Sequence, residues 1–273
     1  MLVKEAIHAA RTALASAGCT EAEEESRLML CGLLGTGLPA LRSRYEDPLD
    51  DGSFRKLNEW IRRRSMHEPL QYILGEWPFF GRSFIVTPDT LIPRPETEEL
   101  CVHAIRLIRL HRYTEVLDLC CGTACIGITV RLETGASVDA GDIDEKALRI
   151  AAENANRLGA GIRFSRGDLF APFQGRKFDL ILINPPYLTR DEMRTLQPEL
   201  VFEPALALYG GEDGMDFYRR IADSYRDHLH AGGTLLMEIG EKQGSGIGRL
   251  FKGCRILQDM NGKDRLCLVD GDA

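Results

Sequence analysis

The chain has 273 residues, of which 44% are hydrophobic, and its formal net charge at pH 7 is −7. A single hydrophobic core usually stops growing near about 250 residues, so we expect one large domain and one small one. The negative charge argues against a general affinity for nucleic acid, because such binding depends on neutralising phosphates with Lys and Arg.

The N-terminal stretch MLVKEAIHAARTALASAG is interrupted by charged residues such as Lys4, Glu5 and Arg11. A secretory signal needs an uninterrupted apolar centre and a membrane helix needs about 18 apolar residues, and neither pattern occurs. We therefore expect a cytoplasmic protein that makes no membrane contact. In that compartment the eight cysteines are expected to be reduced thiols rather than a disulfide framework.

Residues 1–75 predict a small helical bundle, because apolar residues recur along them at helical spacing. Thr20 and Glu23 have the spacing of a capping box, which predicts that a helix starts there. The run Arg62–Arg64 continues an amphipathic stretch. We interpret these arginines as a solvated helix face rather than a nucleic-acid site.

Residues 76–94 predict a β-hairpin that links the helical domain to a third region, residues 95–273. The segment is aromatic and rich in Gly and Pro, and it includes the apolar run Phe84–Val86. At its end, in IPRPETEEL, two prolines hold Arg94 extended just before a helix begins near Glu96. The backbone N–H groups of such a helix start can face a ligand.

After residue 113, segments with strand character alternate with segments of helical character. Such repetition predicts an α/β fold, a Rossmann-like doubly wound parallel sheet of seven strands, which holds ligands at the carboxyl ends of the strands. The expected strands are 115–120, 136–144, 161–168, 177–184, 232–240 and two within 254–271, and the clearest helices are 145–159 and 215–229.

A loop of small residues follows the first of these strands, and its backbone can approach a ligand closely. This interpretation fails if the turn needs a positive φ at Cys120 or Ala124, since both residues carry a Cβ atom. The loop lacks the GxGxxG pattern of a dinucleotide site, and no Walker lysine follows it. Its residues are Cys120, Cys121, Gly122, Thr123 and Ala124.

Acidic residues stand at the ends of the next two strands. Asp142 is placed to accept hydrogen bonds from both hydroxyls of a ribose, while Asp144 is the better candidate for a helix cap. Asp168 is placed to accept from an adenine amino group, with Leu169 and Phe170 flanking the ring. Together these positions predict a ligand that contains adenosine.

The fourth strand ends in the sequence NPPY, residues 184–187. Asn184 is the first polar residue after a buried run, and an unpaired buried amide is costly, so a partner is expected. The Asn184 side-chain oxygen and the Pro185 carbonyl can accept hydrogen bonds from a planar NH2 group, which would favour a developing pyramidal nitrogen. The prolines fix where these acceptors point, and Tyr187 can stack on the planar group. The motif therefore predicts a cradle for an sp2 NH2 group beside a sulfonium methyl donor.

Other chemistries are not indicated. No Ser/His/Asp or Cys/His arrangement stands out, so we expect direct transfer without a covalent enzyme intermediate. We expect no metal site, because the histidines lack ligand spacing and CCGTAC lacks the C-x-x-C pattern.

Motifs spread over residues 69–268 resemble, in order, the HemK/PrmC type of peptide-chain release factor glutamine methyltransferase, a group within the class I methyltransferases that use S-adenosylmethionine. NPPY alone is shared with enzymes that methylate amino groups of nucleic-acid bases, whereas the hairpin, RPETE and GGEDGMDFYRR are not expected there. The matching segments are LIPRPETEEL, VLDLCCGTACIG, GDID, GDLF, INPPY, GGEDGMDFYRRI, LLMEIG and NGKDRL.

The resemblance implies methylation of the glutamine side-chain nitrogen in the Gly-Gly-Gln motif of class I release factors, by a monomer that does not bind nucleic acid directly. The helical domain would hold the body of the release factor, and the segment Asn184, Pro185, Pro186 and Tyr187 would hold the glutamine. Asn184, Pro185 and Tyr187 would carry the catalysis. The expected cofactor residues are Thr97, Asp118, Cys120, Cys121, Gly122, Thr123, Ala124, Asp142, Asp168, Leu169 and Asn184.

The sequence departs from the family pattern in the cofactor loop, where CCGTA replaces the usual GTGSG and two glycines are lost. Two alternatives therefore stay open. One is an amino methyltransferase that acts on DNA or RNA bases, which would need a basic groove and would have to extract its target from a stack. The other is a binding module that keeps the cofactor fold without catalysis.

Overall fold

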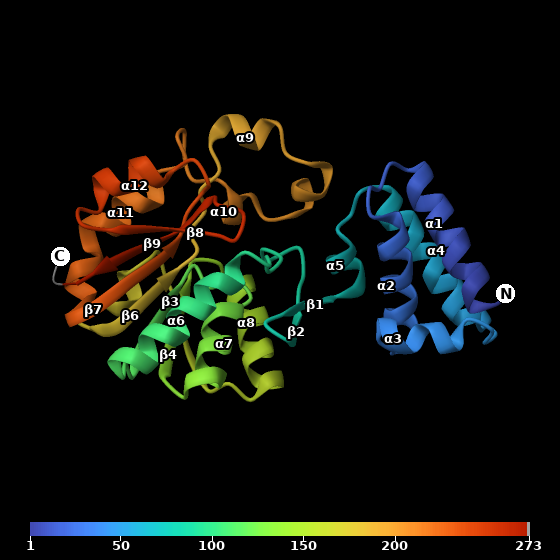
Figure 1. Ribbon diagram of the computed structural model, residues 1–273, viewed down its shortest axis with the longest axis horizontal. Coiled ribbons are helices and arrows are strands. Elements are labelled where there is room, and N and C mark those ends of the chain that lie inside the picture. The colour runs from blue at the N-terminus through green and yellow to red at the C-terminus, as the bar shows by residue number, and fades with distance from the viewer. Residues whose placement is uncertain (272–273) are drawn as a thin grey trace. The chain divides into compact units, whose positions relative to one another are not determined.

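The structure, a computed structural model, describes residues 1–271, and the contacts divide the chain into two compact units (Figure 1). The first unit contains residues 1–76 and the short segment 197–202. The second contains residues 77–196 and the chain from Glu203 onward. The predicted domain limits at residues 75 and 94 stay predictions.

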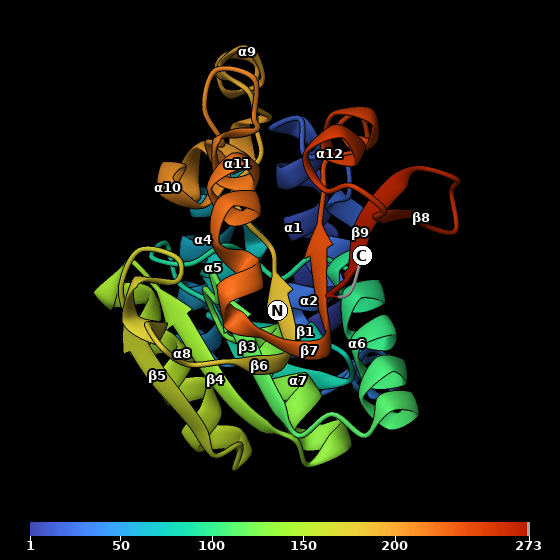
Figure 2. The ribbon, with the colours of Figure 1, turned by 90° about the vertical axis from the view of Figure 1, so that its left-hand side faces the viewer.

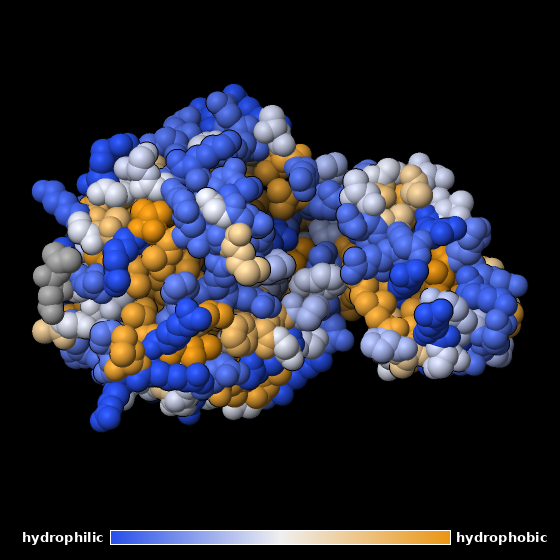
Figure 3. Space-filling view, viewed as in Figure 1, coloured by the Kyte–Doolittle hydropathy of each residue, from blue (hydrophilic) through white to orange (hydrophobic). Residues whose placement is uncertain are grey.

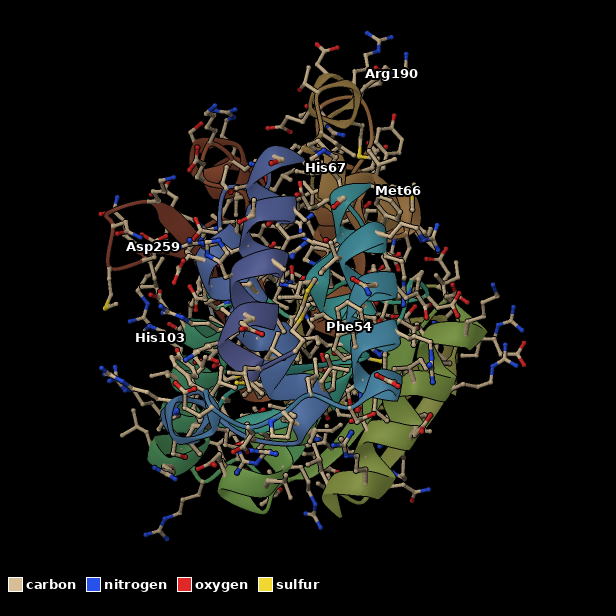
Figure 4. The ribbon with its side chains drawn as sticks, turned by 90° about the vertical axis from the view of Figure 1, so that its right-hand side faces the viewer. Phe54, Met66, His67, His103, Arg190 and Asp259 are labelled. Carbon is tan, nitrogen blue, oxygen red and sulfur yellow. The ribbon has the colours of Figure 1, made fainter. Side chains whose placement is uncertain are left out.

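The first unit is a helical bundle around one apolar core. Figure 4 shows Phe54 on helix α4 and, just beyond the end of that helix, Met66 and His67. Core side chains from several helices meet, among them Leu14, Met29 and Trp60. The helices are α1 (Val3–Ser16), α2 (Ala22–Leu34), α3 (Leu38–Leu41), α4 (Asp51–Ser65) and α5 (Leu70–Leu74), with short 3-10 turns η1 (Arg42–Arg44) and η3 (Pro198–Phe202).

The predicted capping box at Thr20 and Glu23 is wrong. Helix α2 is capped at Glu21, and no side chain there forms a capping hydrogen bond. The Glu23 carboxylate instead pairs with Arg11 and Arg27. The Glu23 carboxylate, which the capping box would have required, is therefore bound to two guanidinium groups.

The prediction of a solvated arginine face is wrong for Arg64. Its side chain is only 5% exposed and pairs at 2.9 Å with both Glu25 and Glu199. A buried cation needs such partners because desolvation is costly. Arg64 thereby attaches the segment 197–202 to the helical unit.

The hairpin, strands β1 (Glu76–Phe79) and β2 (Arg82–Ile85), is present as predicted. Phe79 and Phe84 pack edge to face with ring centroids 6.0 Å apart, inside the core of the second unit.

A buried asparagine, Asn154, holds β2 in place. Its side-chain oxygen accepts from the Ile85 N–H at 2.7 Å, and its nitrogen donates to the carbonyls of Ile85 and Thr123 at 3.1 and 3.2 Å. One side chain thus connects the hairpin to the loop that follows β3.

The second unit confirms the predicted seven-stranded α/β fold (Figure 2). The strand order is β5-β4-β3-β6-β7-β9-β8; the first five strands run parallel, and β9 is antiparallel to both β7 and β8. The strands are β3 (Glu115–Leu119), β4 (Ser137–Asp142), β5 (Ile162–Arg166), β6 (Phe178–Ile183), β7 (Leu229–Glu238), β8 (Arg255–Gln258) and β9 (Asp264–Asp270).

Helices cover both faces of the sheet, which is why most residues of its central strands are apolar. Val116 and Leu180 pack into one core with α6, α7 and α8, whereas Leu117 and Ile181 pack into the other with α11 and α12. These helices are α6 (Thr97–His111), α7 (Cys125–Thr134), α8 (Glu145–Leu158), α11 (Asp216–Ser224) and α12 (Gly244–Leu250); shorter pieces are α9 (Arg190–Arg194), α10 (Ala205–Leu208), η2 (Ala171–Phe173) and η4 (Tyr225–His228).

The face of the molecule in Figure 3 is mostly hydrophilic, with apolar residues in small groups. Across residues 1–271, no helix combines the length and the apolar character that a membrane crossing requires.

Candidate active site

A cavity of about 260 Å³ lies in the second unit, where the carboxyl ends of neighbouring parallel strands meet. Its wall is built from the loops after β3, β4, β5 and β6 and from helix α11. Among the predicted site residues, those that line it are Cys120, Gly122, Asp142, Asp168, Leu169, Asn184 and Pro186.

The loop after β3 has left-handed backbone at three positions. The φ angles are 55° at Cys120, 53° at Gly122 and 58° at Ala124. A residue with a Cβ atom is strained there, so the positive φ that counts against the small-residue interpretation is present at both replaced glycines, Cys120 and Ala124. Cys120 and Gly122 nevertheless face the cavity, while Cys121, Thr123 and Ala124 are buried outside its lining.

Two carboxylates hold the backbone here, one at this loop and one at the start of helix α7. Asp142 accepts from the Gly122 N–H at 2.9 Å, and Asp118 accepts from the Gly127 N–H at 2.8 Å. A Cβ atom at position 127 would lie 2.8 Å from the Asp118 carboxylate, so only glycine fits this close approach. Asp118 is fully buried and does not line the cavity. Burial raises the pKa of Asp118 to about 7, with a further contribution from the nearby Asp142 charge.

Asp142 lies in the cavity wall at the tip of β4, as the sequence predicts for a ribose-binding carboxylate. Its second oxygen accepts from the Asp144 N–H at 3.0 Å. Burial raises the pKa of Asp142 even though these backbone hydrogen bonds oppose the shift. The prediction that Asp144 caps the next helix is confirmed, because its side chain accepts from the Lys146 N–H at 2.8 Å.

Asp168 and Leu169 both line the cavity after β5, but Phe170 does not. The Phe170 ring stacks on His228 with centroids 4.7 Å apart. The Asp168 carboxylate pairs with Arg220 of helix α11 at 2.6 Å. The expected aromatic flank of an adenine is therefore absent at position 170.

Helix α11 supplies wall residues that the sequence analysis missed. Phe217 and Arg220 line the cavity, as do Leu91 from the segment before α6, Leu206 from helix α10, and Ile143 beside Asp142. The sequence predicts a helix over 215–229, but it carries no local signal for the sheet edge over which the helix lies. Only the long-range packing of α11 brings these side chains to the cavity.

The NPPY segment follows β6 directly. Asn184 and Pro186 line the cavity, whereas Pro185 is buried and Tyr187 is half-buried outside the lining. The Tyr187 hydroxyl donates to Glu238 over 3.5 Å. Burial, followed by the Glu238 charge, raises the pKa of Tyr187.

Glycines permit a close approach to the backbone of this segment. A Cβ atom at Gly210 would lie 2.7 Å from the Pro186 oxygen, and one at Gly214 would lie 2.4 Å from the Tyr187 oxygen. Gln243 completes the support, since its side-chain nitrogen donates to the Tyr187 and Gly214 carbonyls at 3.0 Å each.

Thr97 lies at the start of α6 and does not line the cavity, although it is a predicted cofactor residue. Its hydroxyl donates to Glu238 at 2.7 Å, and the Asn184 side-chain nitrogen lies 3.5 Å from the same hydroxyl oxygen. Glu238 is a buried carboxylate at the end of β7, and no sequence argument had singled it out. Burial raises its pKa.

Arg94, which precedes the start of α6, pairs with a carboxylate. It pairs with Glu203, which also accepts from the Ile92 N–H at 3.0 Å. These contacts hold the proline-rich segment before α6 against Glu203. The next residue, Pro204, lines the cavity.

Two family models match the chain: the PrmC N-terminal domain over residues 5–75 and the methyltransferase small domain over residues 104–211. A release factor glutamine methyltransferase of Cereibacter sphaeroides is 40% identical over 97% of each chain. The enzyme of that name from Bacillus subtilis is 38% identical over 92% of this chain and 93% of its own.

A solved structure shows the same sheet at much lower sequence identity. It is a T. thermophilus 16S rRNA N2 G1207 methyltransferase in complex with AdoMet and guanosine, which is 16% identical, has a TM-score of 0.53, and matches over 71% of this chain and 49% of its own. At that identity the likeness concerns the fold alone. The identity and coverage of the curated relatives go further: this chain belongs to the family of release factor glutamine methyltransferases.

Proposed function

We propose that this protein transfers a methyl group from S-adenosylmethionine to the side-chain amide nitrogen of the glutamine in the Gly-Gly-Gln motif of class I peptide-chain release factors. The observation that carries the proposal is the position of Asn184 and Pro186 in the wall of the cavity at the end of β6. The relatives that share nearly the whole chain carry the name of this activity.

The cavity suits an adenosine-containing methyl donor. Asp142 offers a carboxylate to ribose hydroxyls, and Ile143, Leu169 and Phe217 offer apolar surface to a planar base. The left-handed turn at residues 120–122 brings backbone to the cavity at Cys120 and Gly122. S-adenosylmethionine supplies an electrophilic methyl group on its sulfonium.

The contribution of the protein is to orient a poor nucleophile. A carboxamide nitrogen delocalises its lone pair into the carbonyl, so it attacks an electrophile only when held in a geometry that favours the pyramidal nitrogen. The Asn184 oxygen and the Pro185 carbonyl are proposed to accept from its two N–H groups, and Tyr187 to stack on its plane. In the transfer a nitrogen–methyl bond would form while the sulfur–methyl bond of the donor breaks, its electron pair staying on sulfur to give a neutral thioether, and the nitrogen would release one proton to solvent.

The family membership and the net charge of −7 do not favour the alternative of a base-directed amino methyltransferase. A binding module without catalysis is likewise not favoured, because the NPPY segment is held by supporting contacts that reach both Tyr187 and Asn184. We also propose that the helical unit contacts the body of the release factor and that the enzyme acts in the cytoplasm as a monomer.

A labelling experiment tests the proposal. The protein is incubated with methyl-labelled S-adenosylmethionine and with a class I release factor, its Gln→Ala variant in the Gly-Gly-Gln motif, or nucleic acid. We expect label on the unaltered release factor alone. Label on nucleic acid, or equal label on the Gln→Ala variant, would reject it.

A further inference from the structure

Side chains from three elements form a small polar network that includes Asn184. Thr97 comes from the start of α6, Glu238 from the end of β7, and Asn184 and Tyr187 from the segment after β6. Thr97 and Glu238 are each only 2% exposed. Polar groups so deeply buried require partners, and the network provides them.

The hydrogen bonds of this network have a defined direction. An ionised carboxylate can only accept, so the Thr97 hydroxyl directs its single proton to Glu238, 2.7 Å away. The Thr97 oxygen can then only accept from Asn184. The amide of Asn184 has one donor end, its nitrogen, and this end lies 3.5 Å from the Thr97 oxygen.

The orientation of Asn184 follows from that direction. With its nitrogen turned to Thr97, the amide presents its oxygen on the other side, and Asn184 is part of the cavity wall. A flipped amide would present an NH2 group to the substrate NH2 group, and two donors cannot form a hydrogen bond. The direction in which the Asn184 oxygen faces a substrate amide therefore depends on Thr97 and Glu238, two residues outside the cavity lining.

We propose that Thr97 and Glu238 are positioning residues that fix the amide of Asn184 with its oxygen toward the substrate nitrogen. The proposal rests on the proposed function for the identity of the substrate, but the orientation itself is a property of the protein alone. Glu238 sets the direction of the first hydrogen bond, and Thr97 transmits it to Asn184.

The charges around Glu238 bear on this role. Arg265 is the cation that acts on it, and Arg265 in turn pairs at 3.1 Å with Asp259, which Figure 4 labels. Glu96 opposes Arg265, and the Tyr187 hydroxyl donates to the second carboxylate oxygen of Glu238. Burial, the largest influence, raises the pKa of Glu238 and opposes its ionisation, whereas the two hydroxyl donors and Arg265 favour the ionised form that the direction of the network requires.

Threonine substitutions test the proposal. Thr97→Val keeps the shape of the side chain but removes the hydroxyl, whereas Thr97→Ser keeps the hydroxyl. We expect Thr97→Val to lower kcat on the release factor by roughly tenfold to a hundredfold, with KM and cofactor affinity changed little, and Thr97→Ser to recover most of kcat. The matched control is Thr129→Val, because the buried Thr129 hydroxyl has no hydrogen-bond partner among residues 1–271.

A second measurement needs no substrate. In protein labelled with ¹⁵N-asparagine, the side-chain NH2 signals of Asn184, assigned by their loss in Asn184→Ala, should move in Thr97→Val and return in Thr97→Ser. Signals that stay in place, or a Thr97→Val enzyme with unaltered kcat, would overturn the positioning role. If the unaltered protein labelled no release factor, the proposed function would fall, and the NMR result would still decide the orientation of Asn184.

Discussion

The side chain of Gln243 donates to the backbone carbonyl of Tyr187 over 3.0 Å. The same nitrogen donates to Gly214, and the Gln243 oxygen accepts from the Gly240 N–H at 2.9 Å. One glutamine therefore ties the segment proposed to hold the substrate to two neighbouring loops. This relationship supports the site without contributing to the cavity lining.

Replacing Gln243 with Met should disturb catalysis more than binding of the methyl donor. Met fills a similar volume but cannot make the three hydrogen bonds, so the position of Tyr187 should relax. We expect kcat to fall by roughly tenfold or more, with the donor Kd from calorimetry within about twofold of the unaltered enzyme. Gln258→Met is the control, because within residues 1–271 the exposed Gln258 side chain forms a hydrogen bond to Asp264 alone. Equal loss in both variants would contradict the assignment.

Asn184→Ala should separate the two halves of the site. If the Asn184 oxygen orients the substrate nitrogen, its removal should lower kcat by roughly a hundredfold or more, while the donor still binds through the remaining wall. Steady-state methylation of the release factor gives kcat, and calorimetry gives the donor Kd. An unchanged kcat would refute the acceptor role of Asn184.

Replacing alanine with glycine should destabilise the protein less in the cofactor loop than in a helix. Ala124 has a φ of 58°, so Ala124→Gly relieves left-handed strain and should change the free energy of unfolding by less than about 1 kcal/mol. Ala151 is equally buried but lies in helix α8, where Gly should cost roughly 1–2 kcal/mol. Urea denaturation measures both. Similar losses for the two variants would show that the loop is not strained.

Stability should depend on pH through Asp118. Its pKa is raised from 3.8 to about 7 in the folded protein. Below about pH 4 the Asp118 carboxyl is mostly protonated in both the folded and the unfolded protein, so its burial carries no ionisation penalty. As pH rises toward 7 the unfolded state ionises first, so stability is progressively lost, by up to roughly 4 kcal/mol above pH 7.

Asp118→Asn should remove this loss, since its amide oxygen can still accept from the Gly127 N–H. Between about pH 5 and about pH 8, the variant should therefore have a higher free energy of unfolding than the unaltered protein. Urea denaturation at several pH values measures this difference. Asp191→Asn is the control, because that side chain is 91% exposed. A difference between variant and unaltered protein that does not change with pH would contradict the linkage.

Local patterns predict the strands and the position of the acceptor segment well. Residues 180–183 form a buried apolar run that ends at Asn184, and β6 ends at Ile183 as expected. Asp142 stands at the tip of β4, two strands away from β6, for the same reason, since parallel strands bring their carboxyl ends to one edge. These features depend on residues close together in the sequence.

The missed features depend on residues far apart in the sequence. Arg64 resembles any exposed helix arginine until Glu199 meets it, and Glu238 becomes notable only because Thr97 lies beside it. Phe217 and Arg220 reach the cavity through the packing of a whole helix. No spacing rule within one segment contains that information.

The pairing of Arg64 with Glu199 has a consequence for how this protein is divided. The chain enters the helical unit at its start and returns to it at residues 197–202, deep within the methyltransferase sequence. A fragment cut after Glu76 would carry Glu199 away from Arg64 and leave a nearly solvent-free guanidinium with one carboxylate fewer. The helical unit is thus not a detachable module, and swapping it between relatives would require exchange of both stretches together.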